Sequence, residues 1–317
     1  MGRHVKLLTD EASQVTSNNA GHGGSLVLQD IVQELYSAKP TNVLYHYTSL
    51  SGLMGIVDTR SLWISEIRYL NDAEELRHLG RWLSAEIASL LEKPSSNADV
   101  LQQLRNWLPN RLEAGPKIFV GSFTENGNLL SQWRGYCPHG RGVSVGFAAE
   151  EIIAAAGDQD FLVGKCIYDT KQKHVLAERI IKRIVSLAVE RGPDSKKHPL
   201  NSYHGVFSEV EPDLLGIAAV IKDASFHEEK EWRVVSPVHS NYAEAQIMHR
   251  EGAAMLIPYM ELRLPVTGTG SPSLAIERVY VGPTPNVNLS IDSLCTFLAR
   301  ARVKNVRVSN SCIPYRG

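Results

Sequence analysis

The sequence has few cysteines, and no two of them form a closely spaced pair. Cys137, Cys166, Cys295 and Cys312 are scattered over 317 residues, without CxxC or mixed Cys/His spacing. A disulfide framework and a structural zinc site are therefore not expected, and a reducing compartment is the natural setting. The eleven histidines also lack HExxH or HxxEH spacing, which argues against a zinc hydrolase. We predict no metal.

Long apolar runs and an excess of one charge are also missing. No segment approaches the roughly 18–20 apolar residues that a membrane-spanning helix needs, and the N-terminus lacks an apolar core of signal-peptide length. Lys and Arg number 33 against 34 Asp and Glu, so bulk charge favours neither nucleic acid nor a membrane as partner. We expect a cytoplasmic protein with no membrane contact.

The order of helix and strand signals predicts an α+β fold. Near the N-terminus, Ser, Asn and Gly residues precede one run with apolar side chains at helical spacing, so we predict an N-terminal arm, residues 1–40, with one short helix. Residues 41–317 mix both signals without regular β-α-β alternation, which favours a single α+β domain. Two helical insertions are predicted in it, at about 72–113 and 170–222. In the second, residues 211–225 predict a buried helix with Pro212 in its first turn.

The first candidate for chemistry is His46 in the strand candidate VLYHYT. A strand presents its alternate residues on one face, so His46 and Thr48 point the same way. Such a pair can hold vicinal hydroxyls, as on a ribose, because both side chains donate or accept hydrogen bonds. The alternative is a buried histidine that is satisfied by a backbone carbonyl.

The second candidate is the glycine-punctuated stretch 122–142, which we predict as a loop between two strands. It carries Ser131, Gln132, Trp133, Arg134 and Tyr136. Loops that hold aromatic rings, an amide and a guanidinium commonly line a site for a planar ligand. The alternative is an edge loop in which Trp133 packs on the sheet and Arg134 pairs with an acid.

The third candidate is the acidic stretch EEKEWRVV. Glu231 stands at the start of a predicted strand, and Glu228 and Glu229 precede it closely. A carboxylate held on a strand can stabilise a cationic transition state or orient a sugar hydroxyl. The alternative is a solvated rim of three mutually repelling charges.

Taken in order, several motifs resemble a bacterial family known as a domain of unknown function. The resemblance covers residues 43–316. It rests on HYTSLSGLMGIVDTRSLWIS (46–65), RYLNDAEEL (68–76), SFTENGNLLSQWRGYCPHGRGVSVGF (122–147), FHEEKEWRVV (226–235), ERVYVGP (277–283) and SCIPYRG (311–317).

Three of these motifs are also similar to those of the ADP-ribosyltransferase fold, which includes poly-ADP-ribose polymerases and DNA-targeting toxins. There a strand histidine, followed two residues later by Ser or Thr, holds the adenosine ribose of NAD⁺; the matching residues are His46 and Thr48. In the third motif a glutamate opens a strand as the catalytic carboxylate, and Glu231 matches it. The resemblance implies a split β-sheet core flanked by helices.

The second motif of that fold clamps nicotinamide with a serine and an aromatic ring. Ser131 matches the serine, and Trp133 or Tyr136 matches the stacking ring. The tyrosine usual at the preceding strand end is replaced by Phe123, which is a departure from the pattern. By residue type, Arg134 would contact the pyrophosphate.

The resemblance implies an NAD-dependent ADP-ribosyltransferase, with NAD⁺ as substrate, that acts as a toxin or antiphage defence effector. Glu231 would bind the 2′-hydroxyl of the nicotinamide ribose, and Glu229 would orient or activate the acceptor. A nucleic acid, a protein, a small molecule or water fits as acceptor; water would make the protein an NAD glycohydrolase. Two alternatives stay open. They are a non-catalytic NAD- or ADP-ribose-binding module and an RNA-directed phosphotransferase or nuclease-type enzyme.

Overall fold

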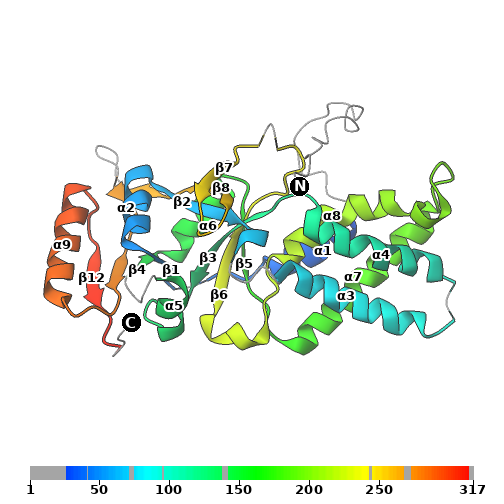
Figure 1. Cartoon of the computed structure of the whole chain (residues 1–317), viewed down its shortest axis with the longest axis horizontal. Coiled ribbons are helices and arrows are strands. Elements are labelled where there is room, and N and C mark those ends of the chain that lie inside the picture. The colour runs from blue at the N-terminus through cyan, green and yellow to red at the C-terminus, as the bar shows by residue number, and fades with distance from the viewer. Residues whose placement is uncertain are drawn as a thin grey trace, which may run out of the picture.

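The structure, a computed structural model, describes residues 26–40, 42–70, 75–94, 96–137, 142–242, 245–267 and 273–313. Figure 1 shows an elongated molecule in which a β-sheet with flanking helices forms one half and a bundle of helices the other. The α+β prediction is confirmed, because the chain forms a mixed, open sheet flanked by helices. Most of the expected N-terminal arm, and parts of the RYLNDAEEL, HGRG and SCIPYRG stretches, lie outside the described residues.

Helices and strands are interspersed along the described residues without regular β-α-β alternation. The helices are α1 (Leu26–Leu35), α2 (Leu50–Thr59), α3 (Glu75–Leu91), α4 (Ala98–Ala114), α5 (Leu130–Tyr136), α6 (Ala149–Gly157), α7 (Thr170–Arg191), α8 (His204–Ala218) and α9 (Val287–Arg300), with short 3-10 turns η1 (Ile67–Tyr69), η3 (Pro199–Asn201) and η4 (Ala224–Glu229). The strands are β1 (Leu44–Thr48), β2 (Ser61–Glu66), β3 (Phe119–Thr124), β4 (Val143–Phe147), β5 (Leu162–Lys165), β6 (Glu231–Val235), β7 (Met248–Glu251), β8 (Leu256–Arg263), β9 (Val266–Thr267), β10 (Ser273–Leu274), β11 (Arg278–Val281) and β12 (Arg307–Asn310).

The sheet forks at β3. One edge of β3 pairs with β6 along most of its length, whereas its other edge is shared between two strands. There β1 joins at the pair Tyr45–Thr124, and β2 joins at the other end, at Ser65–Val120. Ser122 lies between these two junctions. In a strand, alternate residues direct their backbone groups to the same edge, so the Ser122 carbonyl faces the gap between β1 and β2.

Beyond the fork the strands form two branches. One runs outward from β1 through β4 and β11 to β12, and the other from β2 through β8 to β7. Only the β11–β12 pairing is parallel among the pairs of the described sheet. Side chains of α2, α6 and α9 fill an apolar core against the strands, with Leu53, Ile152 and Leu298 among the buried residues.

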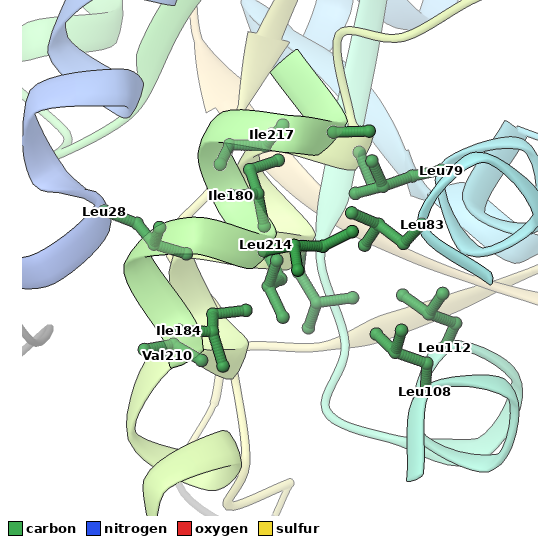
Figure 2. Packing of buried hydrophobic residues seen from close by; sticks show 14 of the residues in the cluster. Leu28, Leu79, Leu83, Leu108, Leu112, Ile180, Ile184, Val210, Leu214 and Ile217 are labelled. Atoms are coloured by element: carbon green, nitrogen blue, oxygen red, sulfur yellow. The ribbon is translucent and has the colours of Figure 1, made fainter. Parts of the chain in front are cut away.

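Helices α1, α3, α4, α7 and α8 pack together as a bundle. Helices α3 and α4 lie in the stretch predicted as the first insertion and α7 and α8 in the second, and α1 packs against α8 and α7. Figure 2 shows the leucine, isoleucine and valine side chains that meet between them. Each such side chain, when fully buried, stabilises the fold by about 1.5–3 kcal/mol. Apolar packing therefore holds the bundle together.

Two local predictions were wrong. Helix α8 begins at His204 rather than at Glu211, so Pro212 lies inside it, and it ends at Ala218. A proline inside a helix costs about 3 kcal/mol, and the buried side chains of the preceding turns, such as Phe207 and Val210, offset that cost. The second error is the loop predicted at 122–142, because its middle forms the short helix α5.

Candidate functional site

A cavity of about 1010 Å³ opens at the fork of the sheet. Its wall comes from β1, α2, β2, η1, β3, β6, β7 and β8, together with Tyr136 at the end of α5 and Lys222 after α8. A smaller cavity adjoins it. His46, Tyr136 and Glu231 line both cavities, whereas Phe123 and Glu229 line the smaller one and Thr48 the larger. The fold thus brings residues from three of the motifs together.

Glu231 lies in a buried ionic cluster at the floor of this cavity. The Lys222 ammonium donates to Oε2 of Glu229 at 2.5 Å and to Oε2 of Glu231 at 2.6 Å. Arg233, on the same face of β6 as Glu231, donates from Nε to Oε1 at 2.8 Å and from Nη2 to Oε2 at 3.3 Å. All four side chains are buried. The solvated rim is therefore not what the structure shows for Glu229 and Glu231, while Glu228 is exposed.

The cluster keeps Glu231 ionised. Burial alone would raise the pKa of its carboxyl, but the charges of Arg233 and Lys222 and their hydrogen bonds outweigh this and hold the pKa well below its usual range. Burial alone would lower the pKa of Lys222. The negative charge of Glu231 outweighs this effect, and the pKa of Lys222 is raised. Two cations thus face two carboxylates in one desolvated group, and removing any member would leave a buried charge without its partner.

His46 is held at the gap between β1 and β3. Its Nδ1 lies 3.0 Å from the Ser122 carbonyl oxygen, and its ring lies 5.9 Å from that of Phe123. Burial lowers the pKa of His46, so the ring is neutral near pH 7. A carbonyl only accepts, and Nδ1 must therefore carry the proton, which leaves Nε2 as an acceptor. The backbone partner expected for a buried histidine is present, and the side chain lines the cavity as well.

Because residues 130–136 form helix α5, some side chains of the predicted nicotinamide loop line the cavity and others lie in the core. Gln132 and Tyr136 are four residues apart, so they lie on the same face of the helix, and both line the smaller cavity. Trp133 points the other way and is fully buried beside Tyr47, with its Nε1 donating to Asn128 Oδ1 at 3.0 Å. The packing alternative thus describes Trp133, and Tyr136 is the ring that reaches the cavity.

The other two residues of this stretch lie away from both cavities. Arg134 is exposed and is not part of either cavity wall. The Ser131 hydroxyl is buried, lines neither cavity, and has no hydrogen-bond partner among the described residues.

The burial of Trp133 leads to a prediction that separates packing from ligand stacking. Trp133→Phe is expected to lower the free energy of unfolding by about 1–3 kcal/mol, because the smaller ring leaves space and the bond to Asn128 is lost. Affinity for a planar ligand should not change. Urea unfolding and calorimetric titration with NAD⁺ measure the two effects. Weaker NAD⁺ binding with unchanged stability would contradict the assignment of Trp133 to the core.

Sequence reasoning missed Lys222, Arg233 and Tyr168, whose hydroxyl oxygen accepts from the Glu231 backbone N–H at 2.9 Å. For Arg233 a signal existed, since a residue two positions after Glu231 on a strand shares its face. For Lys222 the signal was its position directly after the apolar run GIAAVI. A single charge there must either pair with a buried carboxylate or be exposed to solvent. Because a helix was predicted over residues 211–225, Lys222 was not recognised as a residue of the site.

Comparison with known proteins gives one match, and it includes the cluster. A family model described as a protein of unknown function (DUF2971) matches residues 132–234. This range, about a third of the chain, runs from α5 through β6 and contains Lys222, Glu229, Glu231 and Arg233. The match is consistent with the resemblance to a family of unknown function. No curated protein and no solved structure matches the chain.

Across the described ranges, no helix has both the length and the apolarity required to cross a membrane. Within the same ranges, no three His, Cys, Asp or Glu side chains are grouped so that they could hold a metal ion.

Proposed function

We propose that this protein is an ADP-ribosyltransferase that cleaves the nicotinamide glycosidic bond of NAD⁺ and transfers ADP-ribose to a macromolecular acceptor. The observation that carries this proposal is the meeting of His46, Tyr136, Glu229 and Glu231 at adjoining cavities. These residues come from segments about 90 positions apart in the chain. The similarity of their motifs to those of the ADP-ribosyltransferase fold supports the same function. A role as a toxin or defence effector rests on that resemblance alone.

Glu231 has the hydrogen-bonding capacity that the reaction needs. A carboxylate offers about four acceptor sites, and three hydrogen bonds from Lys222 and Arg233 end on its two oxygens. Oε1 receives only one of them. A substrate hydroxyl, such as the 2′-hydroxyl of the nicotinamide ribose, would complete the set. Because the carboxylate stays charged, it would stabilise positive charge on that ribose.

In the proposed reaction the bond between C1′ of the ribose and the nicotinamide nitrogen breaks, and nicotinamide leaves with the electron pair. The ribose becomes oxocarbenium-like, and the Glu231 charge favours that state. A nucleophile of the acceptor then forms a bond to C1′ and loses a proton. Glu229, at the smaller cavity, would receive that proton or orient the nucleophile.

The remaining contacts follow from position. Tyr136 and Phe123 line the smaller cavity and would flank the nicotinamide ring. Nε2 of His46 would accept from a hydroxyl of the adenosine ribose. Thr48, two residues further along β1 and on the same face, lines the larger cavity. We give Ser131, Trp133 and Arg134 no contact with NAD⁺, since they lie outside both cavity walls.

A second candidate is a non-catalytic module that binds NAD⁺ or ADP-ribose. The observation in its favour is that Lys222 and Arg233 already engage Glu231. The phosphotransferase alternative needs unpaired cations for RNA phosphates. At the floor of the cavity Lys222 and Arg233 face two carboxylates, so the cluster has no excess positive charge to support it.

Incubation of the purified chain with NAD⁺ tests the first candidate against the second. Chromatography should detect released nicotinamide, and labelled NAD⁺ should transfer its ADP-ribose to an acceptor present in the assay. Release without transfer would indicate a glycohydrolase. A higher melting temperature with NAD⁺ or ADP-ribose, but no nicotinamide after prolonged incubation, would establish the binding module instead.

The position of His46 leads to a prediction on substrate affinity. His46→Ala is expected to raise KM for NAD⁺ about tenfold, because one hydrogen bond to the distal ribose is lost, and to change kcat little. Steady-state nicotinamide release measures both constants. His198→Ala is the matched control, since His198 is exposed and lines neither cavity. An unchanged KM in the His46 variant would remove it from the binding site.

A further inference from the structure

Trp63 is an exposed aromatic ring on a strand that lines the cavity. It lies on the same face of β2 as Ser61 and Ser65, and all three line the larger cavity. The side chain is 42% exposed, although most large apolar residues of the sheet are buried. Tyr259 on β8 stacks against one side of the ring, with centroids 4.5 Å apart and planes inclined by 28°. The orientation of Trp63 is therefore fixed while part of its surface remains uncovered.

A cation lies beside this stacked pair. In the β7–β8 ladder Arg250 pairs with Ile257, so it shares a face with Tyr259, two residues further along β8. Arg250 Nη2 donates to Ser65 Oγ at 3.2 Å, and Arg250 and His249 both line the larger cavity. Trp63, Tyr259 and Arg250 thus form one surface on the β2–β8–β7 branch, which we term the aromatic branch site.

The cavity is large for a ligand site. Pockets that enclose a single small ligand typically measure about 300–1,000 Å³, and this cavity, about 1010 Å³, lies at the top of that range. The aromatic branch site belongs to one branch of the fork, whereas Glu231 and Tyr136 belong to β6 and α5. A ligand on Trp63 would therefore share the cavity with a ligand at Glu231 without using the same residues.

We propose that the aromatic branch site binds a nucleobase that carries a phosphate, as part of the acceptor. An exposed indole supported from behind is suited to stack on a flat heteroaromatic ring, and every base has such a face. The guanidinium of Arg250 is suited to a phosphate oxygen. The assignment of this ligand as acceptor rests on the proposed function. The base comes either from single-stranded nucleic acid or from a free nucleotide.

Binding measurements with the full chain test this site. The probes are fluorescently labelled 12-nucleotide single strands of DNA and RNA, with CMP and AMP as competitors. Trp63→Ala is expected to weaken strand binding about tenfold or more, and Trp63→Phe, which keeps a stacking face, by less than about threefold. Arg250→Gln should lower the slope of log affinity against log salt by about one. Tyr242→Ala is the matched control, because Tyr242 is an exposed aromatic residue outside both cavity walls.

The outcomes separate the sources of the base. Binding of the strands but not of CMP or AMP identifies nucleic acid, and competition by CMP or AMP at similar concentrations identifies a free nucleotide. Both results support the site if they depend on Trp63. Unchanged binding in Trp63→Ala, no nucleotide binding at all, or a protein labelled in place of nucleotides would overturn it. Equal weakening of NAD⁺ in Trp63→Ala would also overturn it, because the ring would then belong to the NAD⁺ site.

Failure of this inference differs from failure of the proposed function. Strand binding that depends on Trp63, in a chain that releases no nicotinamide, would reject the enzyme and keep the nucleobase site. Nicotinamide release without any nucleotide binding would do the reverse. Glu231→Gln is expected to keep its affinity for the strands within about threefold, since Glu231 does not belong to the aromatic branch site.

Discussion

Glu231→Gln is expected to lower kcat for nicotinamide release by about 10²–10³, the typical cost of removing one group that stabilises charge in a transition state. Glutamine keeps the shape of the side chain but lacks the charge that would oppose the cationic ribose. Measurement at saturating NAD⁺ isolates this effect from binding. Glu228→Gln is the matched control, because Glu228 is exposed and three residues away, and its kcat should stay within twofold of the wild-type value.

The ionic cluster makes a second readout necessary for this variant. Loss of the Glu231 charge leaves Lys222 and Arg233 buried with fewer partners, so part of the protein can unfold. Calorimetric titration with NAD⁺ resolves this, since only folded molecules bind. A variant with normal NAD⁺ affinity and no turnover supports a catalytic carboxylate. A folded variant with full activity would refute the role of Glu231.

Lys222→Met is expected to lower the free energy of unfolding by about 3–5 kcal/mol, because it leaves Glu229 and Glu231 without one of their buried partners. Urea unfolding followed by circular dichroism measures the loss. Lys182→Met on the exposed face of α7 is the control and should change stability by no more than about 0.5 kcal/mol. Adding Glu229→Gln to Lys222→Met should restore part of the loss, since one unpaired charge is removed with it.

The pH dependence of the same variant provides an internal check. The folded-state pKa of Glu231 is depressed, so its contribution to stability is present above the unfolded value of about 4.3 and is lost as the pH falls through the folded value. The stability difference between wild type and Lys222→Met should therefore be constant near pH 6–7 and shrink below about pH 4. A difference that stays constant down to low pH would show that lost packing, rather than lost charge, destabilises the variant.

Much of the fold was predictable because the strands that carry the site have strong local signals. VLYHYT and EWRVV alternate side chains over two faces, and the structure places His46 and Glu231 on β1 and β6. Ser49 likewise caps α2 by accepting from the Gly52 backbone N–H, a local signal that the sequence contains. The secondary structure of such elements is determined mainly by residues close in sequence, and tertiary contacts agree with it.

The site itself was less predictable, since its partners are chosen by the fold. The short helix α5 decides whether Trp133 contacts a ligand or packs against Tyr47. The glycines on either side of this helix led to its prediction as a loop. The Lys222 ammonium can bond to the Glu231 carboxylate only because α8 ends at Ala218 and the chain then turns toward β6. Sequence spacing can place two residues on one strand face, as with Arg233, but it cannot predict a contact across a turn whose boundary is unknown.

Lys222 connects the helix bundle to the ionic cluster of the sheet. Lys173 on α7 donates to the Lys222 carbonyl, and the Lys222 ammonium then holds both carboxylates at the cavity floor. An excised sheet would keep Glu229 and Glu231 facing each other without this cation, and an isolated bundle would lose the anchor of its last helix. Removal of the bundle would therefore also disturb the ionic cluster at the cavity.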